Sequence, residues 1–163
     1  LRYFNPIGSH FSGLIGENPV GKPNNIFPLI LNTALGIQKQ LELYGNDWPT
    51  KDGTAIRDYI HVMDLAEAHI KILENLFENN RTFINLNVGT GIGTSVLELI
   101  KIFEKVNNTK VPYVFSKRRL GDACSVVADN STLINKFKIV PKFSIEDMCR
   151  DGWKWKKLNP NGY

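Results

Sequence analysis

The sequence predicts an α/β fold, and three observations lead to this prediction. The chain has 163 residues and is 42% hydrophobic, which is enough for one compact domain with its own core. Short strand-like runs alternate with segments of helical period along the chain. Several of those helical segments begin at polar capping signatures. We find neither an internal repeat nor a low-complexity segment, so mixed helices and strands account for the whole chain.

The N-terminal part predicts a strand, a long loop and a helix. Residues 1–4 (LRYF) resemble a strand, and residues 7–25 form a turn-rich stretch without a sustained period. Loops longer than about 12 to 15 residues in a compact domain are usually functional. Asn24 or Asn25 can cap the next helix, and Gly36 loosens or ends it. The apolar face of this helix carries Ile26, Ile30, Ala34 and Ile37.

The central part predicts two strands and a long helix. Residues 41–45 (LELYG) alternate as a short strand does and are followed by turn formers up to residue 53. Residues 60–62 resemble a buried strand. Asp64 and Glu67 have the spacing of a capping box at the start of a helix. The apolar stripe of that helix is Ala66, Ile70, Leu73 and Phe77.

The C-terminal part predicts two more strands and three helices. Residues 82–89 (TFINLNVG) and 111–115 (VPYVF) are strand-like. The predicted helices begin at Ser95 with Glu98, near Asp129, and at Ser144 with Asp147.

Composition excludes several classes of protein. No apolar run approaches the roughly 20 residues of a membrane span, and no signal segment opens the chain, so we expect a soluble, cytoplasmic protein. Leu1 stands where a start methionine would, and we expect the back part of a longer protein. Cys124 and Cys149 lack CxxC spacing, and the three histidines lack ligand spacing, so neither a disulfide framework nor a metal site is predicted. His69 is predicted to be packed in the core.

The charge is unevenly distributed. Residues 1–100 carry 7 basic and 10 acidic side chains, whereas residues 101–163 carry 13 and 6. A basic C-terminal part suits either nucleic acid or a phosphorylated small molecule, and charge alone does not decide between them. Arg119 and Asp122 lie in a glycine turn directly after a predicted strand, where ligand contacts often gather. Arg57 is either a solvated charge or an anion ligand.

Two motifs suggest cofactor chemistry, and both fail on spacing or context. Residues 89–94 (GTGIGT) follow a predicted strand, but Thr94 holds the third glycine position and no acidic residue follows at the required distance. A tight turn is the favoured interpretation. Tyr113 and Lys117 form Y-x-x-x-K, which acts as an acid/base pair only on a helix, where residues four apart share a face. The VPYVFSK context predicts a strand, so we interpret this match as chance.

Longer motifs carry a family resemblance over essentially the whole chain. They are LRYFNPIGSH, the PNN of GKPNNIFP, LYGNDWPTKDGTAIRDYIHVMDLAEAH, NLNVGTGIGTSV, and RRLGD followed by AD. The chain resembles the C-terminal half of the UDP-glucose 4-epimerase family of extended short-chain dehydrogenases/reductases. The resemblance implies a C-terminal substrate-binding α/β domain plus the last elements of an NAD(P)-binding Rossmann-type domain. The family's NAD-binding motif and its catalytic residues lie upstream of Leu1, so this chain is expected to hold no catalytic residue.

The resemblance implies a reaction and its components. UDP-glucose and UDP-galactose are interconverted when bound NAD takes the C4 hydride and returns it to the other face of the sugar. The implied cofactor is NAD, the implied small-molecule partner is a UDP-sugar, and the full-length protein is expected to be a homodimer. Nucleic acid and membrane are not expected partners. This chain alone is expected to be inactive.

Site residues carry over from the family position by position. Phe4 is expected to contact NAD, and Asn5 the substrate. Arg57 and Arg119 are expected to clamp the diphosphate, and Asp122 to accept from the ribose hydroxyls. The remaining implied substrate contacts are Asn25 and Ile26 at the diphosphate, the backbone of Glu42, Leu43 and Tyr44 at the uracil, and Leu120 and Gly121 between the last clamp residues.

Two positions depart from the family pattern, and two other classes stay open. Leu120 stands where the family usually has Glu. Val126 stands where UDP-galactose-restricted members have Tyr and members that accept N-acetylated sugars have Cys or Ser, so we expect room for a 2-acetamido group. A UDP-sugar decarboxylase or nucleotide-sugar dehydratase would share the fold, and a basic nucleic-acid binder is the non-enzymatic alternative.

Overall fold

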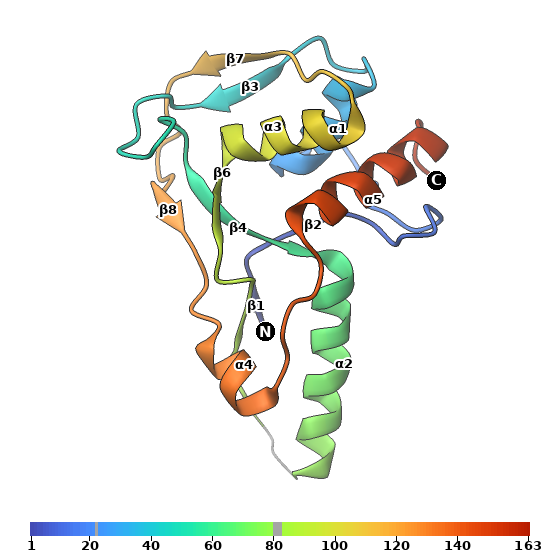
Figure 1. Ribbon diagram of the computed structural model, residues 1–163, viewed down its shortest axis with the longest axis vertical. Coiled ribbons are helices and arrows are strands. Elements are labelled where there is room, and N and C mark those ends of the chain that lie inside the picture. Colours follow the sequence, from blue (N-terminus) through green and yellow to red (C-terminus); the bar gives the residue numbers. More distant parts are fainter. Residues whose placement is uncertain (22, 80–82) are drawn as a thin grey trace.

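The computed structural model describes residues 1–21, 23–79 and 83–163, and it has the predicted mixture of helices and strands (Figure 1). The helices are α1 (Ile26–Ala34), α2 (Val62–Glu78), α3 (Val96–Asn107), α4 (Ser131–Phe137) and α5 (Ile145–Leu158). The strands are β1 (Arg2–Tyr3), β2 (Asn5–Ile7), β3 (Leu41–Tyr44), β4 (Ile56–His61), β5 (Asn87–Val88), β6 (Gly93–Ser95), β7 (Tyr113–Ser116) and β8 (Ser125–Val126). The expected α/β class is confirmed.

Strand β4 is the centre of the fold. It pairs in parallel with β2 and β8 and antiparallel with β6, whereas β1 with β5 and β3 with β7 form two separate parallel pairs. In Figure 1, β4 descends from the wider part of the molecule, which holds β3, β7, α1 and α3, to the start of α2 in the narrower part. One strand therefore contributes residues to both parts.

Two hydrophobic cores lie on either side of this strand. The first joins α1, α3, α5 and β3, where the Phe103 ring meets the edges of Phe27 and Trp153 at centroid distances of 6.2 and 5.7 Å. The second packs α2 and α4 against Ile60 of β4 and Val88 of β5. Residues of β4 are held rigidly because both cores pack against that strand.

Local capping signals placed two helices correctly and misplaced one. Ser95 with Glu98 and Ser144 with Asp147 form the predicted capping boxes of α3 and α5. The capping box predicted at Asp64 is wrong, because the N-cap of α2 is His61, three residues earlier. The Asp64 carboxylate instead accepts hydrogen bonds from the backbone N–H groups of residues 142 and 143, at 3.0 and 3.1 Å.

Some strand boundaries also differ from the prediction. Strand β4 begins at Ile56 rather than at residue 60, so Arg57 lies within the sheet. Within the expected N-terminal strand, residues 1–4, the structure has β1, whereas β2, β6 and β8 were not predicted. A strand was predicted over residues 82–89. Residue 82 lies outside the described residues, and among residues 83–89 only β5 is a strand.

The apolar stripe predicted on α2 faces outward. Ile70 and Phe77 are 60% and 78% exposed, whereas Leu65, Ala68 and Ile72 pack into the second core. The prediction that His69 is a core residue is wrong, because it lies on the exposed side, where its Nε2 is 3.0 Å from the hydroxyl of Tyr3. Alanine and histidine are compatible with either face of an amphipathic helix, so periodicity alone could not choose the buried one.

The buried side chain of His61 should make the stability of the folded state depend on pH. Its side chain is fully buried and stacks on Phe143; its Nδ1 accepts from the Met63 N–H, and its Nε2 lies 3.3 Å from the Asp151 carboxylate. Burial lowers the pKa of the imidazole, and the nearby carboxylates of Asp151, Asp64 and Asp147 offset this only in part. The unfolded chain therefore takes up the proton first as pH falls.

The folded state should thus be most stable above about pH 6.5, the pKa of an unperturbed histidine, and lose up to about 1.4 kcal/mol per pH unit below it. Urea unfolding at pH 7.5 and 5.5 measures this loss. His61→Gln should remove most of the difference, while the exposed control His69→Gln should keep it. An equal loss in both variants would contradict the assignment.

Candidate functional site

A cavity of about 200 Å³ opens above β4, between the start of α1, strand β3 and the loop that follows β7. A neighbouring hollow of about 400 Å³ shares five of its residues, so the two are continuous along the edge of β3. The first cavity is lined by Asn5, Asn24, Asn25, Ile26, Leu29, Glu42, Leu43, Tyr44, Ala55, Arg57, Tyr59, Val96, Arg119 and Asp122.

Nine of the residues that the sequence nominated for substrate line this cavity: Asn5, Asn25, Ile26, Glu42, Leu43, Tyr44, Arg57, Arg119 and Asp122. Four nominated residues lie outside the lining. Phe4 lies between β1 and β2, Leu120 is fully exposed, and Gly121 occupies the turn with φ +87°. Val126 is paired with Arg57 in the sheet.

Strand alternation places a row of polar side chains toward the cavity. Arg57 and Tyr59 are two residues apart on β4, so their side chains leave the same face. Asn5 of β2 is the parallel partner of Tyr59, and Val126 of β8 is the parallel partner of Arg57. All four side chains therefore share one face of the sheet, while Asp58 points to the other.

Arg57 is held at the floor of the cavity. Its Nη1 donates to the carbonyl oxygens of Ile56 and Ala123 at 2.8 and 2.9 Å, and its Nη2 lies 3.8 Å from the Asp122 carboxylate. The side chain is only 19% exposed. A guanidinium has five N–H donors, so this oriented group retains donors for an anion. A freely solvated surface charge is excluded.

The two consecutive arginines of the loop have different surroundings. Arg118 donates to the side chain and the backbone of Asp47, and its guanidinium covers the Trp48 ring at 4.0 Å, so it anchors the loop. Arg119 lies over the Tyr44 ring at 3.7 Å in the cavity lining. The Tyr44 hydroxyl donates to Glu42 at 2.8 Å. Arg119 is thus a second cation that faces the cavity on an aromatic support.

The N-terminus of α1 adds partial positive charge to the same cavity. Asn25 is the N-cap, its side chain makes no capping hydrogen bond, and the first turn contains no acidic residue. Free backbone N–H groups and the helix dipole both favour an anion at this position. Two guanidinium groups and one helix N-terminus therefore converge on one hollow, an arrangement suited to a diphosphate.

The GTGIGT segment is a tight turn held by a buried carboxylate. Asp58 accepts hydrogen bonds from the Thr90 N–H, the Thr90 hydroxyl, the Gly91 N–H and the Ala128 N–H, at 2.8, 2.6, 2.9 and 3.1 Å. These amides are already paired and cannot cradle a pyrophosphate. The predicted tight turn is confirmed, and these residues do not fit the phosphates of a dinucleotide.

The strand predicted for the Y-x-x-x-K segment is confirmed, because residues 113–116 form β7 rather than a helix. Among the described residues, no group of three histidine, cysteine or acidic side chains is placed to hold a metal ion. Both cysteines are free; Cys149 is buried and Cys124 partly so. Within the same ranges, no helix combines the length and apolar character that crossing a membrane requires.

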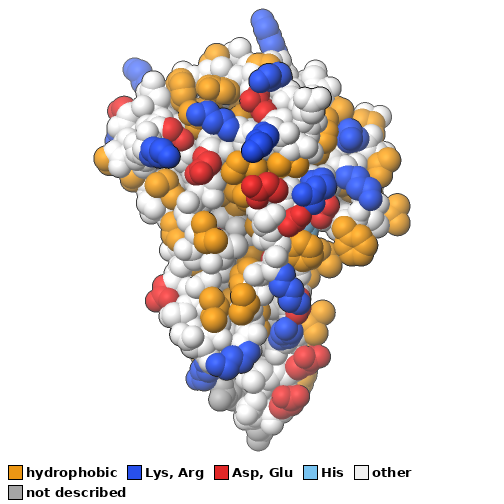
Figure 2. Space-filling model, viewed as in Figure 1, with side chains coloured by type: hydrophobic (Ala, Val, Ile, Leu, Met, Phe, Trp, Pro, Cys, Tyr) orange, Lys and Arg blue, Asp and Glu red, His pale blue; other side chains and the backbone are white. Residues whose placement is uncertain are grey.

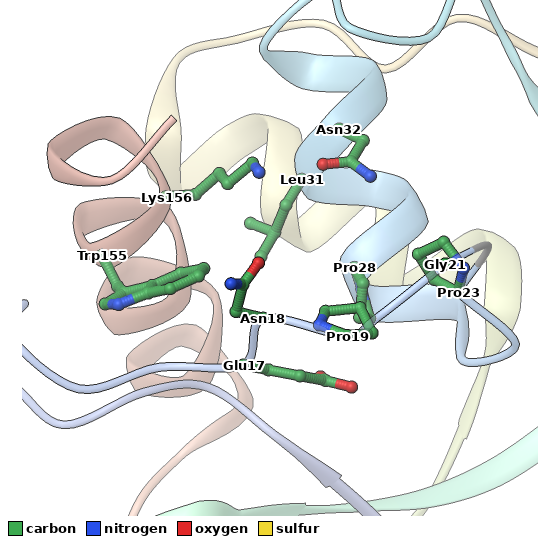
Figure 3. Close-up of a pocket in the computed structure, with 10 residues that line it drawn as sticks. All are labelled: Glu17, Asn18, Pro19, Gly21, Pro23, Pro28, Leu31, Asn32, Trp155 and Lys156. Atoms are coloured by element: carbon green, nitrogen blue, oxygen red, sulfur yellow. The ribbon is translucent and has the colours of Figure 1, made fainter. Parts of the chain in front are cut away.

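A smaller hollow of about 80 Å³ lies between α1, α5 and the loop before α1 (Figure 3). Several prolines and Trp155 line it, and Lys156 in its lining donates to the Pro160 carbonyl at 3.0 Å. On the face drawn in Figure 2, Lys and Arg side chains alternate with Asp and Glu rather than forming a basic field. On this face the described residues therefore form no continuous basic surface of the kind that binds nucleic acid.

Five lining residues were missed by sequence reasoning: Asn24, Leu29, Ala55, Tyr59 and Val96. Tyr59 was detectable, because it is two positions beyond Arg57 in a strand and must share its face. The other four are adjacent to nominated residues or come from segments that only the fold brings to the cavity.

These features define a class of protein. The family model of the NAD dependent epimerase/dehydratase family matches residues 1–89, and the chain belongs to this family. The family is NAD-dependent, and solved homologues contain NAD.

The similar proteins narrow this class. The chain is 50% identical over its whole length to UDP-glucose 4-epimerase 4 of Oryza sativa subsp. japonica, covering 44% of that protein. A UDP-glucose-4-epimerase from Stenotrophomonas maltophila, solved with NAD and formylated UDP-arabinopyranose, superposes with a TM-score of 0.93 at 46% identity, over 96% of this chain and 46% of that one. The enzyme from Bifidobacterium longum, in complex with NAD+ and UDP, gives 0.90 at 40% identity, over 99% and 48%. The chain spans about half the length of the curated relatives it matches.

Proposed function

We propose that this chain is the UDP-sugar-binding, C-terminal half of a UDP-glucose 4-epimerase, which interconverts UDP-glucose and UDP-galactose. The proposal includes the terminal elements of a Rossmann-type NAD-binding domain and a homodimeric full-length protein. Its main support is the convergence of Arg57, Arg119 and the α1 N-terminus on one cavity. The likeness to epimerases over about half of their length supports it further.

The cavity suggests how the substrate is held. The diphosphate would lie between Arg57, Arg119 and the start of α1, where positive charge is concentrated. The nucleoside would extend along the β3 edge, with the backbone of residues 42–44 at the uracil and Asp122 at the ribose. Asp122 would then exchange its long contact with Arg57 for ribose hydroxyls. Asn5, which lies on β2 beside Tyr59, would contact the sugar.

Binding energy concentrated on UDP suits a reaction in which the sugar must present both faces to one hydride donor. Firm contacts at the diphosphate allow loose contacts at the hexose. The GTGIGT turn has its amides paired with Asp58, and in this proposal Phe4 is the residue of this chain that contacts NAD. The proton-transferring residues and most NAD contacts are therefore assigned to the part of the family's length that this chain does not cover.

Product analysis of the full-length protein tests the reaction class. With UDP-galactose as substrate, an epimerase yields a product of unchanged mass that co-elutes with UDP-glucose. Loss of carbon dioxide or of water would instead indicate a decarboxylase or a dehydratase of the same fold.

Val126 carries a further proposal about substrate range. It lies outside the cavity lining but is the sheet partner of Arg57 and shares the sheet face of that residue, and its side chain is much smaller than tyrosine. We expect the full-length enzyme to convert UDP-N-acetylglucosamine, because the space left by valine accommodates a 2-acetamido group. Val126→Tyr should reduce that turnover at least about tenfold through steric overlap while turnover of UDP-glucose stays within about threefold. Normal turnover of UDP-glucose by the unmodified enzyme, with none of the N-acetylated sugar, would refute this.

A further inference from the structure

The hydroxyl of Tyr59 is a buried polar group without a partner. The residue is 3% exposed, and its Oη makes no hydrogen bond to any part of the chain that the structure describes. Leaving such a group unpaired costs about 1 to 3 kcal/mol, so buried hydroxyls are nearly always satisfied. The exception requires an explanation, and a ligand that supplies the missing acceptor is one.

The position of Tyr59 indicates which ligand. The residue lines the cavity, shares a strand face with Arg57 and is the sheet partner of Asn5. Burial raises the pKa of its hydroxyl, and the positive charge of Arg57 counteracts this only in part. The phenol therefore stays protonated and can donate its proton in a hydrogen bond beside a fixed guanidinium.

We propose that Tyr59 is a positioning residue of the UDP-sugar site, whose hydroxyl donates a hydrogen bond to a phosphate oxygen of the diphosphate held by Arg57. This inference rests on the proposed function. Strand pairing with β2 fixes the position of the Tyr59 backbone. The hydroxyl would set the depth at which the diphosphate enters the cavity and so align the sugar relative to Asn5.

The test compares UDP affinity and thermal stability of full-length Tyr59→Phe with those of the unmodified protein. Loss of one hydrogen bond to a charged group should weaken UDP binding about 10- to 100-fold. The melting temperature of the protein without UDP should stay the same or rise, because phenylalanine keeps the packing and removes only an unsatisfied hydroxyl. Uridine, which lacks phosphates, should bind both proteins equally.

Tyr113→Phe is the matched control, because Tyr113 is an exposed tyrosine on β7 outside the cavity and should change neither property. Equal UDP affinity of Tyr59→Phe and the unmodified protein would overturn the inference while leaving the proposed function intact. A lowered melting temperature would overturn it too, because the hydroxyl would then have a partner within the fold. If the unmodified protein does not bind UDP, the proposed function itself fails.

Discussion

Replacing Arg57 with alanine should weaken UDP binding about 30- to 100-fold. Hydrogen bonds to charged groups contribute about 1.5 to 3 kcal/mol each, and the guanidinium is already oriented by two backbone carbonyls, so little order is lost when it binds a phosphate. Calorimetric titration of the full-length protein measures the change. Binding of uridine should be almost unaffected, because the lost contact is to the diphosphate.

Two further variants separate charge from geometry. Arg57→Lys keeps the positive charge but loses the planar fork, and it should lie between the unmodified protein and the alanine variant. Arg150→Ala is the matched control, because Arg150 is an exposed arginine paired with Asp147 and lies outside the cavity. UDP affinity that is unchanged in Arg57→Ala would refute the role assigned to Arg57.

Replacing Asp58 with alanine should have the largest effect on stability, about 3 to 5 kcal/mol. The carboxylate is fully buried and accepts hydrogen bonds from three backbone amides and one hydroxyl. Alanine removes the acceptor of four hydrogen bonds, of which the one from the Ala128 N–H is fully buried, and a buried donor without an acceptor is costly. Denaturant unfolding measures the loss as a lower midpoint.

Asp58→Asn tests whether the acceptor oxygens cause this effect. Asparagine keeps the volume but replaces one acceptor oxygen with a donor that would face the N–H groups of Gly91 and Ala128 or that of Thr90. Its loss should be smaller than that of the alanine variant yet still exceed about 1 kcal/mol. A loss below about 1 kcal/mol in both variants would show that water or another group satisfies these amides.

The parts of the fold that depend on short-range signals were predictable. Capping boxes are local, so Ser95 and Ser144 fixed the starts of two helices. Strand β4 was underestimated, because consecutive charged residues, Arg57 and Asp58, indicate a loop when only local sequence is considered. Both residues are compatible with the sheet because distant segments supply their partners. Arg57 contacts Ala123 and Asp122, and Asp58 accepts hydrogen bonds from the 89–94 turn. Such partners cannot be predicted without the fold.

The candidate site shows the same division. Local reasoning left Arg57 equally compatible with solvent and with an anion, and the family resemblance supplied most of the cavity's lining. Neither route nominated Tyr59. Strand alternation places it on the same face as Arg57, but only the structure shows that its hydroxyl is unpaired. Helical periodicity identified the apolar stripe of α2 that faces outward. Whether that stripe is buried or exposed depends on which other segments pack against the helix.

The central claim is that this chain forms a diphosphate site for a UDP-sugar. Titration of the full-length protein with UDP and with uridine in parallel tests it most directly. The arrangement of Arg57, Arg119 and the α1 N-terminus predicts that UDP binds at least about tenfold more tightly than uridine, because those groups recognise phosphate. Equal affinity for the two ligands, or no binding of UDP, would contradict the claim.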